Sequence, residues 1–382
     1  MESHHLYGMK HRNLALAENL SLAANKIDSV KQTEVAISGG GIIGLSAALE
    51  LARAGVQVTV FDRARAMAEA SSAAAGMLAA SDPDNPIALR PLAMLSARLY
   101  SQFLAQVEEL SGERVPIRTR QTFQGSPELP EGFTSLTAEQ LQAVAPGIVC
   151  GGLHFFSLDE GSLAPGDLAF ALPKAVRAAG VSLVENTQIT RVRERDAAVE
   201  IETTAGRWTA GKFVHASGAW AAQLSGLPVA PRKGQMVMIE EPRHASLKAV
   251  LRTPEIYLVP RGDRRIVVGA TVEDAGFDKQ IDNGAIEGLL DKAASLWPPV
   301  REARILESWA GLRPATPDAL PVIDALGDRS WIAAGHFRNG ILLAPATAQL
   351  LRQMILDEPA DIDLRNFSSR RFASAAQELS VR

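Results

Sequence analysis

Three glycines near the start of the chain have the types and spacing needed to bind a dinucleotide. Gly39, Gly41 and Gly44 follow the pattern G-x-G-x-x-G, directly after an apolar segment that ends at Ser38. The first glycine permits a tight turn, the second lets the backbone approach a pyrophosphate, and the third allows the next helix to pack closely on the sheet. The N-terminus of that helix would face the phosphates, because its free N–H groups and dipole favour negative charge.

A carboxylate lies where this motif needs one for the ribose. Residues 57–61 are typical of a second strand, and Asp62 follows them about twenty residues beyond the glycines. There it can accept hydrogen bonds from both ribose hydroxyls, and it would repel a 2′-phosphate. Apolar residues recur at helical spacing from Leu45 to Ala52, which predicts the intervening helix. A plain β-α-β unit with an incidental Asp62 is the alternative.

Composition limits the partners of the protein. The length of 382 residues suggests two domains, given the usual size of a domain. The net charge of −4 and the lack of a basic run argue against nucleic-acid binding. No stretch reaches the roughly 18 apolar residues of a membrane span. Cys150 is the only cysteine, which excludes an internal disulfide and fits a reducing compartment, so we expect a cytoplasmic protein. No metal site is expected.

The first 32 residues are predicted to be an extension that precedes the fold. Their apolar stretch, residues 14–24, is interrupted by Glu18 and Asn19, so it makes a poor secretory segment. The extension is interpreted as a short surface helix or a remnant of cloning, and a targeting role is the alternative.

Beyond the first unit, the chain alternates helices with short strands. Residues 71–78 are small and predict a second loop that contacts the cofactor, and residues 217–220 form a small-residue turn after the strand 212–216. Helices are expected over 85–110, 137–144, 168–179 and 285–296. Further strands, the first four arranged as a meander, are expected over 182–184, 188–195, 199–204, 207–208, 236–240, 255–260, 265–270 and 305–310.

Seven segments together match one family pattern: residues 39–44, 71–78, 216–220, 257–261, 269–271, 309–318 and 334–347. On these motifs the chain resembles the D-amino-acid oxidase superfamily of FAD enzymes. It is most similar to the glycine oxidase branch, which is associated with making the thiazole of thiamine. The resemblance covers residues 33 to 372, and the stretch 85–152 matches least.

The resemblance implies an α/β fold with two domains. A discontinuous, Rossmann-like FAD-binding domain would comprise residues 33–84, 161–228 and 311–382, and an α+β substrate domain with a mixed or antiparallel sheet would comprise 85–160 and 229–310. FAD would be bound non-covalently, since Cys150 lies outside the C-terminal motif to which some relatives tether it. The residues expected to contact FAD are Gly39, Gly41, Ile42, Ile43, Gly44, Asp62, Arg63, Ser71, Ser72, Ala75, Gly76, Met77, Ile189, Gly218, His336, Phe337, Arg338, Asn339, Gly340, Ile341 and Leu342.

Three residues are expected on the substrate side. A flavin that oxidises an amine takes a hydride from the carbon next to nitrogen, so the protein needs a fixed cation for the substrate carboxylate more than a strong acid or base. Arg313 ends an apolar strand, and the matching arginine of the family binds that carboxylate; an interdomain salt bridge is the alternative. Arg338 is expected to contact the substrate as well. Tyr257 either contacts the substrate or packs across strands.

Two further residues bear on the chemistry of this site. His336 has small neighbours and is expected to act through its backbone, so we expect no catalytic acid or base. Val272 departs from the glycine oxidase pattern, which has methionine there, and this puts the substrate preference in doubt.

These observations favour oxidation of glycine, with sarcosine or small D-amino acids as side substrates. The products would be an imine, hydrolysed to a keto acid and ammonia, and hydrogen peroxide from molecular oxygen. The alternatives are a D-amino-acid dehydrogenase with another electron acceptor and a flavin-binding partner without turnover. We also expect a homo-oligomer, whose size the sequence does not give.

Overall fold

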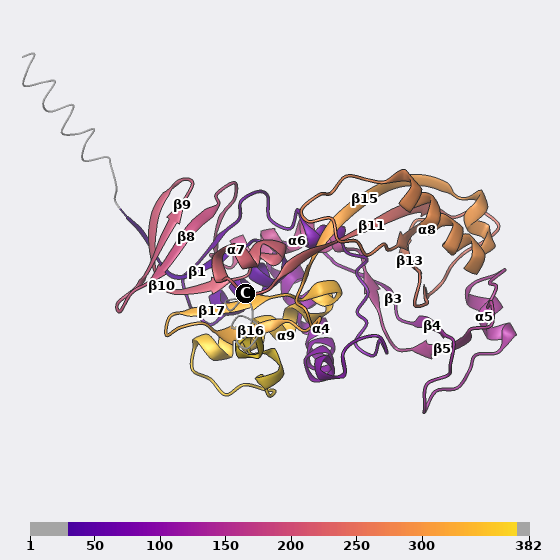
Figure 1. Ribbon diagram of the computed structural model, residues 1–382, viewed down its shortest axis with the longest axis horizontal. Helices are drawn as coiled ribbons and strands as arrows, with labels where there is room; N and C mark the ends of the chain where they lie inside the picture. The colour runs from indigo at the N-terminus through magenta and orange to yellow at the C-terminus, as the bar shows by residue number, and fades with distance from the viewer. Residues whose placement is uncertain (1–29, 373–382) are drawn as a thin grey trace, which may run out of the picture.

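Two large sheets, at opposite ends of the chain's long axis, organise the fold (Figure 1). The structure is a computed structural model that describes residues 30–372. The predicted extension therefore lies outside the described residues, except that the first strand already begins at Lys31. A separate two-stranded sheet joins β3 (Ile117–Thr119) to β6 (Ser162–Leu163).

The first sheet is parallel at its centre. Its strands, in spatial order, are β16 (Val322–Ala325), β17 (Ser330–Ala334), β10 (Gly206–His215), β1 (Lys31–Ser38), β2 (Val58–Phe61) and β7 (Ser182–Val184). Only β16 pairs antiparallel along this path. The strands β8 (Ile189–Glu194) and β9 (Val199–Thr203) extend from β10 as an antiparallel hairpin. The carboxyl ends of β1 and β10 therefore meet at one edge, where ligands bind in open α/β sheets.

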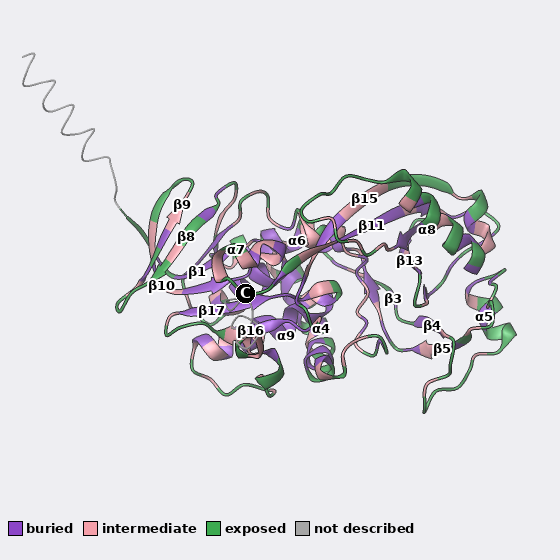
Figure 2. Cartoon of the chain, in the orientation of Figure 1, coloured by how far each residue is buried: buried purple, intermediate pink, exposed green. Residues whose placement is uncertain are grey.

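Apolar helices cover this sheet. They are α2 (Ile42–Arg53), α4 (Arg90–Ser111), α6 (Pro165–Ala178) and α9 (Gly340–Ile355), with the short α3 (Ala70–Ala73) and α7 (Ala221–Ser225) nearby. Most side chains of α2 and α9 are buried, as Figure 2 shows by their purple ribbons, and both contribute to one core with the strands. Such all-round burial explains why these segments lack the polar face of a surface helix.

The second sheet is mostly antiparallel. Its order is β15 (Arg304–Ala315), β11 (Ala230–Glu240), β14 (Arg265–Gly269), β13 (Tyr257–Gly262), β12 (Val250–Arg252), β4 (Thr122–Ser126) and β5 (His154–Leu158). Only β4 and β12 run parallel. Helix α8 (Asn283–Leu296) packs on this sheet, and α5 (Ala138–Val144) contributes Leu141 to the same core. The expected mixed α/β architecture is confirmed.

Local signals explain where several helices begin. Thr137 and Gln140 form a capping box at the start of α5, in which each side chain bonds the other's backbone N–H. Asp282 caps α8 by accepting from Gly284 N at 3.0 Å. These residues satisfy N–H groups that a helix leaves without partners at its first turn.

The strand predictions differ from the structure in three places. Residues 207–208 and 212–216 belong to the single strand β10, and β7 pairs with β2 instead of joining the meander. The strands β3, β4, β5, β6, β12 and β16 were not predicted at all. They are short, and all but β16 pair with a strand far along the chain, so their local sequence carries little strand signal.

The predicted domain boundaries remain a proposal, which we adjust at one helix. Helix α4 was assigned to the substrate domain, but it packs against α9 and α6. Ser96 Oγ donates to Leu342 O at 2.6 Å, and Tyr100 Oη donates to Ile341 O at 3.1 Å. We therefore propose that α4 belongs to the FAD-binding domain.

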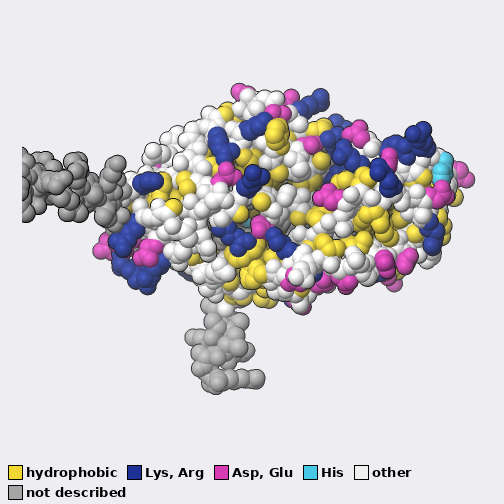
Figure 3. All heavy atoms as spheres, turned by 90° about the horizontal axis from the view of Figure 1, so that it is seen from above, with side chains coloured by type: hydrophobic (Ala, Val, Ile, Leu, Met, Phe, Trp, Pro, Cys, Tyr) yellow, Lys and Arg dark blue, Asp and Glu magenta, His cyan; other side chains and the backbone are white. Residues whose placement is uncertain are grey.

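Between residues 30 and 372, no helix combines the length and the apolar character needed to cross a bilayer. On the face drawn in Figure 3, basic and acidic side chains are interspersed, as the small net charge indicates.

Candidate active site

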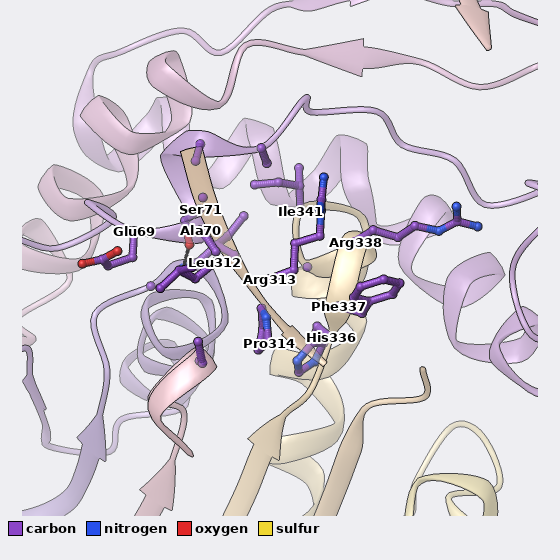
Figure 4. A pocket seen from close by; sticks show the side chains of 18 of the residues that line it. Glu69, Ala70, Ser71, Leu312, Arg313, Pro314, His336, Phe337, Arg338 and Ile341 are labelled. Carbon is purple, nitrogen blue, oxygen red and sulfur yellow. Dashed lines mark hydrogen bonds between the residues drawn. The ribbon is translucent and has the colours of Figure 1, made fainter. Parts of the chain in front are cut away.

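One cavity of about 350 Å³ extends from the glycine turn to the start of α9 and to the inner side of the second sheet. This size falls within the range of small-molecule and cofactor sites. Its walls come from segments that are far apart in the sequence, as Figure 4 shows for residues 69–71, 312–314 and 336–341. The cavity therefore exists only once both sheets have formed.

Each of the three motif positions carries glycine for a different structural reason. Gly39 has a φ of +104°, and a Cβ on it would lie 2.3 Å from Ala216 O. A Cβ on Gly44 would lie 2.0 Å from Gly39 O, so the helix could not approach the turn. Gly41 faces the cavity, where a Cβ would meet only Ser71 Oγ at 3.3 Å. The turn is therefore tight and closely packed behind, and open on its cavity side.

Asp62 stabilises the same turn. Its Oδ2 accepts from Gly40 N at 2.7 Å, and its Oδ1 accepts from Ala64 N at 2.8 Å. Burial raises the pKa of Asp62, and these two backbone donors lower it. Each oxygen keeps a second lone pair, so Asp62 can still accept from ribose hydroxyls at the cavity wall.

The cavity fits FAD in two further respects. The hydroxyls of Ser38 and Ser217 line it, and each is buried without a hydrogen-bond partner in the structure. The N-termini of α2 and α9 both open onto it, near Gly41 and Gly340, where backbone N–H groups favour negative charge. The unpaired hydroxyls and the N–H groups of the two helix N-termini can donate hydrogen bonds to the diphosphate and to the polar edge of the flavin ring of FAD.

Arg313 lies on β15 with its guanidinium at the cavity wall. Its Nη1 donates to Thr271 O at 3.0 Å and to Lys233 O at 3.5 Å. Across residues 30–372, no carboxylate forms an ion pair with it, so its charge is balanced by carbonyl dipoles alone. A cation in this state is suited to a ligand carboxylate, which arginine can bind through two parallel hydrogen bonds.

Tyr257 lies beside this arginine. Burial raises the pKa of its hydroxyl and the Arg313 charge lowers it, with burial the larger effect, so the phenol is neutral at physiological pH. A Cβ on Gly269 would lie 2.6 Å from Tyr257 Oη, so the absent side chain makes room for the ring. Tyr257 lines the cavity and also packs across strands, since it lies opposite Gly269 in the register of β13 and β14.

Arg338, unlike Arg313, has a carboxylate partner. Its Nη2 lies 3.4 Å from Asp82 Oδ2 and 3.4 Å from Asn85 Oδ1. Figure 4 shows the two arginine side chains pointing in different directions. The expected substrate contact of Arg338 stays a prediction, and its charge already has a partner.

His336 is buried, and its Nε2 lies 3.0 Å from Thr347 Oγ1. Burial lowers its pKa to about 3, so the ring is neutral and hydrogen-bonded within the protein. This environment agrees with a contribution through the backbone.

Nearly all of the predicted site residues line the cavity, including all three substrate-side residues. Gly44, Ser72 and Leu342 do not. Gly44 packs under the turn, Ser72 donates to Glu69 O, and Leu342 is buried between α9 and α4. Val272 lines the cavity but is 66% exposed, which places it at the mouth.

Sequence reasoning missed five charged residues of the wall: Glu69, Asp82, Asp84, Arg252 and Glu255. Arg252 ends the apolar run Val250-Leu251 and is buried, and such a charge in an apolar strand is the signal that could have identified it. Asp82 has no comparable signal, because its loop is polar throughout.

A dinucleotide turn at the edge of a parallel sheet and, within residues 30–372, an arginine without a carboxylate partner line one cavity, and the sheet and its turn define a dinucleotide-binding protein. The family model for FAD dependent oxidoreductases, DAO, matches residues 34–354. The chain therefore belongs to this family, which confirms the expected superfamily, the oxidoreductase class and FAD as cofactor.

Similar proteins agree with this assignment. Glycine oxidase of Geobacillus kaustophilus is 33% identical over 88% of this chain and 97% of its own length. Its crystal structure matches with a TM-score of 0.83, covering 89% of this chain and 98% of that one. The bifunctional protein ThiO/ThiG of Nostoc sp. is 36% identical over 91% of this chain, which spans only 56% of that protein.

Proposed function

We propose that this FAD-dependent enzyme is an amino-acid oxidase whose principal substrate is glycine, with sarcosine and small D-amino acids as side substrates. The products are an imine, hydrolysed to the keto acid and ammonia, and hydrogen peroxide. The observation that carries the proposal is Arg313, a cavity-lining guanidinium that donates to two backbone carbonyls and has no carboxylate partner among residues 30–372. The similarity to glycine oxidase over 97% of that protein's length supports the choice of substrate.

The roles of the side chains follow from their positions. Arg313 binds and orients the substrate carboxylate through its planar fork. Tyr257, buried and neutral beside it, limits the space around the substrate and can donate a hydrogen bond. Bound FAD supplies the acceptor for the hydride of the substrate α-carbon and is reoxidised by oxygen. The N-terminus of α9 stabilises negative charge at the cavity wall around Gly340 and Ile341.

No side chain is needed as a general base in this scheme. His336 is buried, neutral and bonded to Thr347, so it is not available to take a proton from the substrate amine. The amine must instead enter in its neutral form, with Arg313 and the cavity walls holding the α-carbon in position.

We further propose that the reaction serves the synthesis of the thiamine thiazole. The support is the 36% identity to the bifunctional protein ThiO/ThiG, within which the matched region makes up about half of the chain. A dehydrogenase that uses another electron acceptor remains the alternative on the same fold. A partner without turnover has no need of a carboxylate clamp such as Arg313.

The test is anaerobic reduction of the purified holoenzyme. Addition of glycine without oxygen should bleach the flavin absorbance, whereas an unbleached spectrum would contradict the glycine assignment. In air, one peroxide per glycine consumed identifies an oxidase, and turnover that requires an added quinone identifies a dehydrogenase. Sarcosine, D-alanine and L-alanine complete the panel, and L-alanine is expected to be inactive.

A further inference from the structure

Four charged residues, three of them buried and one exposed, form a connected network at the cavity wall. We call Asp82, Glu160, Arg252 and Arg338 the charge cluster. Arg252 Nη2 lies 3.0 Å from Glu160 Oε2, and Arg252 Nη1 lies 3.7 Å from Asp82 Oδ2. The same Asp82 oxygen lies 3.4 Å from Arg338 Nη2. Asp82 therefore joins a buried arginine to the arginine of the cavity wall.

The cluster is neutral as a whole, since it contains two arginines and two carboxylates. The side chains of Asp82, Glu160 and Arg252 are 6%, 2% and 5% exposed, so solvent hardly screens them. Glu160 is held in addition by Ser81 N, which donates to its Oε1 at 2.6 Å, and Arg252 donates to Gln124 Oε1. These bonds fix Arg252, so Asp82 lies between one fixed cation, Arg252, and the exposed Arg338.

Arg313 stands outside this network. It lines the same cavity but has no carboxylate partner among residues 30–372, whereas the Arg338 charge is balanced by Asp82. Four arginines line the cavity: Arg63, Arg252, Arg313 and Arg338. Arg63 pairs with Glu69, and Arg252 and Arg338 belong to the charge cluster, so among residues 30–372 the wall offers one positive charge without a carboxylate partner. A second carboxylate on a ligand would have to displace Asp82 from Arg338 or lie beside it, and both cost free energy.

We propose that Asp82 is a specificity-determining residue that restricts the site to substrates with one carboxylate. It does so by holding and neutralising Arg338, so that amino acids with an acidic side chain find no second cation. This inference rests on the proposed function for its substrate class, small amino acids. Its physical content is that one of the four arginines in the cavity wall has no carboxylate partner among residues 30–372, and this is tested without turnover.

The experiment compares the binding of acetate and malonate to the holoenzyme, followed by the change in flavin absorbance on titration. The two ions differ by one carboxylate. In Asp82→Asn, which keeps the shape of the side chain, Arg338 loses its ionic partner, and malonate affinity should rise about tenfold relative to acetate affinity. Unchanged relative affinity for malonate, with FAD bound, would overturn the proposal.

Two matched variants show whether the gain acts through Arg338. Asp82→Asn combined with Arg338→Met should abolish it. Glu160→Gln removes the same unit of charge from the cluster, but Glu160 has no contact with Arg338, so it should leave the ratio of the two affinities within about twofold of wild type. A gain that persists without Arg338, or an equal gain in Glu160→Gln, contradicts the assignment to Asp82.

A single substitution gives an independent test should Asp82→Asn fail to retain FAD. Arg338→Met in the wild-type background should change the affinities for acetate and malonate by the same factor, because Arg338 is already paired with Asp82 and adds no binding for a second carboxylate. A loss of malonate affinity that exceeds the loss of acetate affinity by about tenfold or more would show that Arg338 acts as a free cation, which overturns the proposal. The proposed function and the proposed role of Asp82 can be refuted separately. Reduction of the flavin by glycine tests the function, and these titrations test whether Asp82 neutralises Arg338.

Discussion

The guanidinium of Arg313 lies directly over the α-carbon of Gly234 on the neighbouring strand. A Cβ built on Gly234 would be 2.2 Å from Arg313 Nη1 and 2.4 Å from Cζ. Strands β11 and β15 pair antiparallel here, with Gly234 opposite Gly311. The absent side chain is therefore part of how the carboxylate-binding group is positioned.

Gly234→Ala should displace Arg313 without affecting the cofactor turn. We expect the KM for glycine to rise about tenfold, since a misplaced group loses much of a charge-assisted hydrogen bond. Flavin content should stay at the wild-type level. Steady-state kinetics and the flavin-to-protein absorbance ratio measure both quantities.

Gly288→Ala is the matched control for this substitution. Gly288 lies exposed in α8, and a Cβ there would meet nothing within 4 Å. It should leave KM unchanged and raise the stability by about 0.5–1 kcal/mol, because alanine favours a helix. An equal rise of KM in both variants would mean that Gly234 does not act through Arg313.

Arg313→Lys tests the fork geometry separately from the charge. Lysine keeps the positive charge but cannot form two parallel hydrogen bonds to a carboxylate, so we expect the KM for glycine to rise about 10- to 100-fold. Arg232→Lys serves as control, because Arg232 is opposite Arg313 in register but pairs with Asp274 outside the cavity. A KM near wild type in Arg313→Lys would favour a point charge over bidentate binding.

Arg261 connects the second sheet to the cofactor loop. Its guanidinium donates to Leu163 O at 2.6 Å and to Ala75 O, and burial lowers its pKa to about 10, so it stays charged. Arg261→Met should release the loop around residues 74–78 and weaken FAD binding about tenfold, measured as the dissociation constant of the reconstituted apoprotein.

Arg264→Met is the control for this effect. Arg264 also donates to a carbonyl, but its acceptor Glu241 does not line the cavity, whereas Ala75, the acceptor of Arg261, does. Its substitution should leave FAD affinity unchanged. If both variants lose FAD equally, the loss reflects general destabilisation of the second sheet.

Two buried histidines should make the fold sensitive to acid. Burial lowers the pKa of His336 to about 3 and that of His215 to about 4, below the ordinary 6.5. Between pH 6.5 and about 4 the unfolded chain binds a proton at each site and the folded chain does not. The free energy of unfolding therefore falls as pH falls, by about 1.4 kcal/mol per pH unit for each histidine.

His336→Gln should remove one of these two contributions. Urea unfolding at pH 7 and pH 5, at fixed FAD concentration, should show a smaller loss of stability in the variant than in the wild type. His154→Gln, at an exposed position, should behave as wild type. An undiminished pH dependence in His336→Gln would show that the ring is not buried in its neutral form.

Much of the cofactor site could be predicted because its physics is local. Gly39, Gly41 and Gly44 act through backbone geometry within one turn, and the apolar residues at helical spacing after them predict the helix. The charge cluster could not be predicted in the same way. Asn85 and Arg338 are 253 positions apart, and no local pattern indicates that the fold brings Asp82 and Asn85 against Arg338.

The sequence by itself determined the dinucleotide turn, its acidic partner Asp62 and the two arginines of the substrate side. Only the tertiary structure decided which of those arginines is free. Both are equally charged as residue types, but whether that charge is available depends on the carboxylates that distant segments bring to it. Asp82 reaches Arg338 in the folded chain, and backbone carbonyls reach Arg313. The substrate-binding charge is therefore a property of the fold and cannot be read from either residue alone.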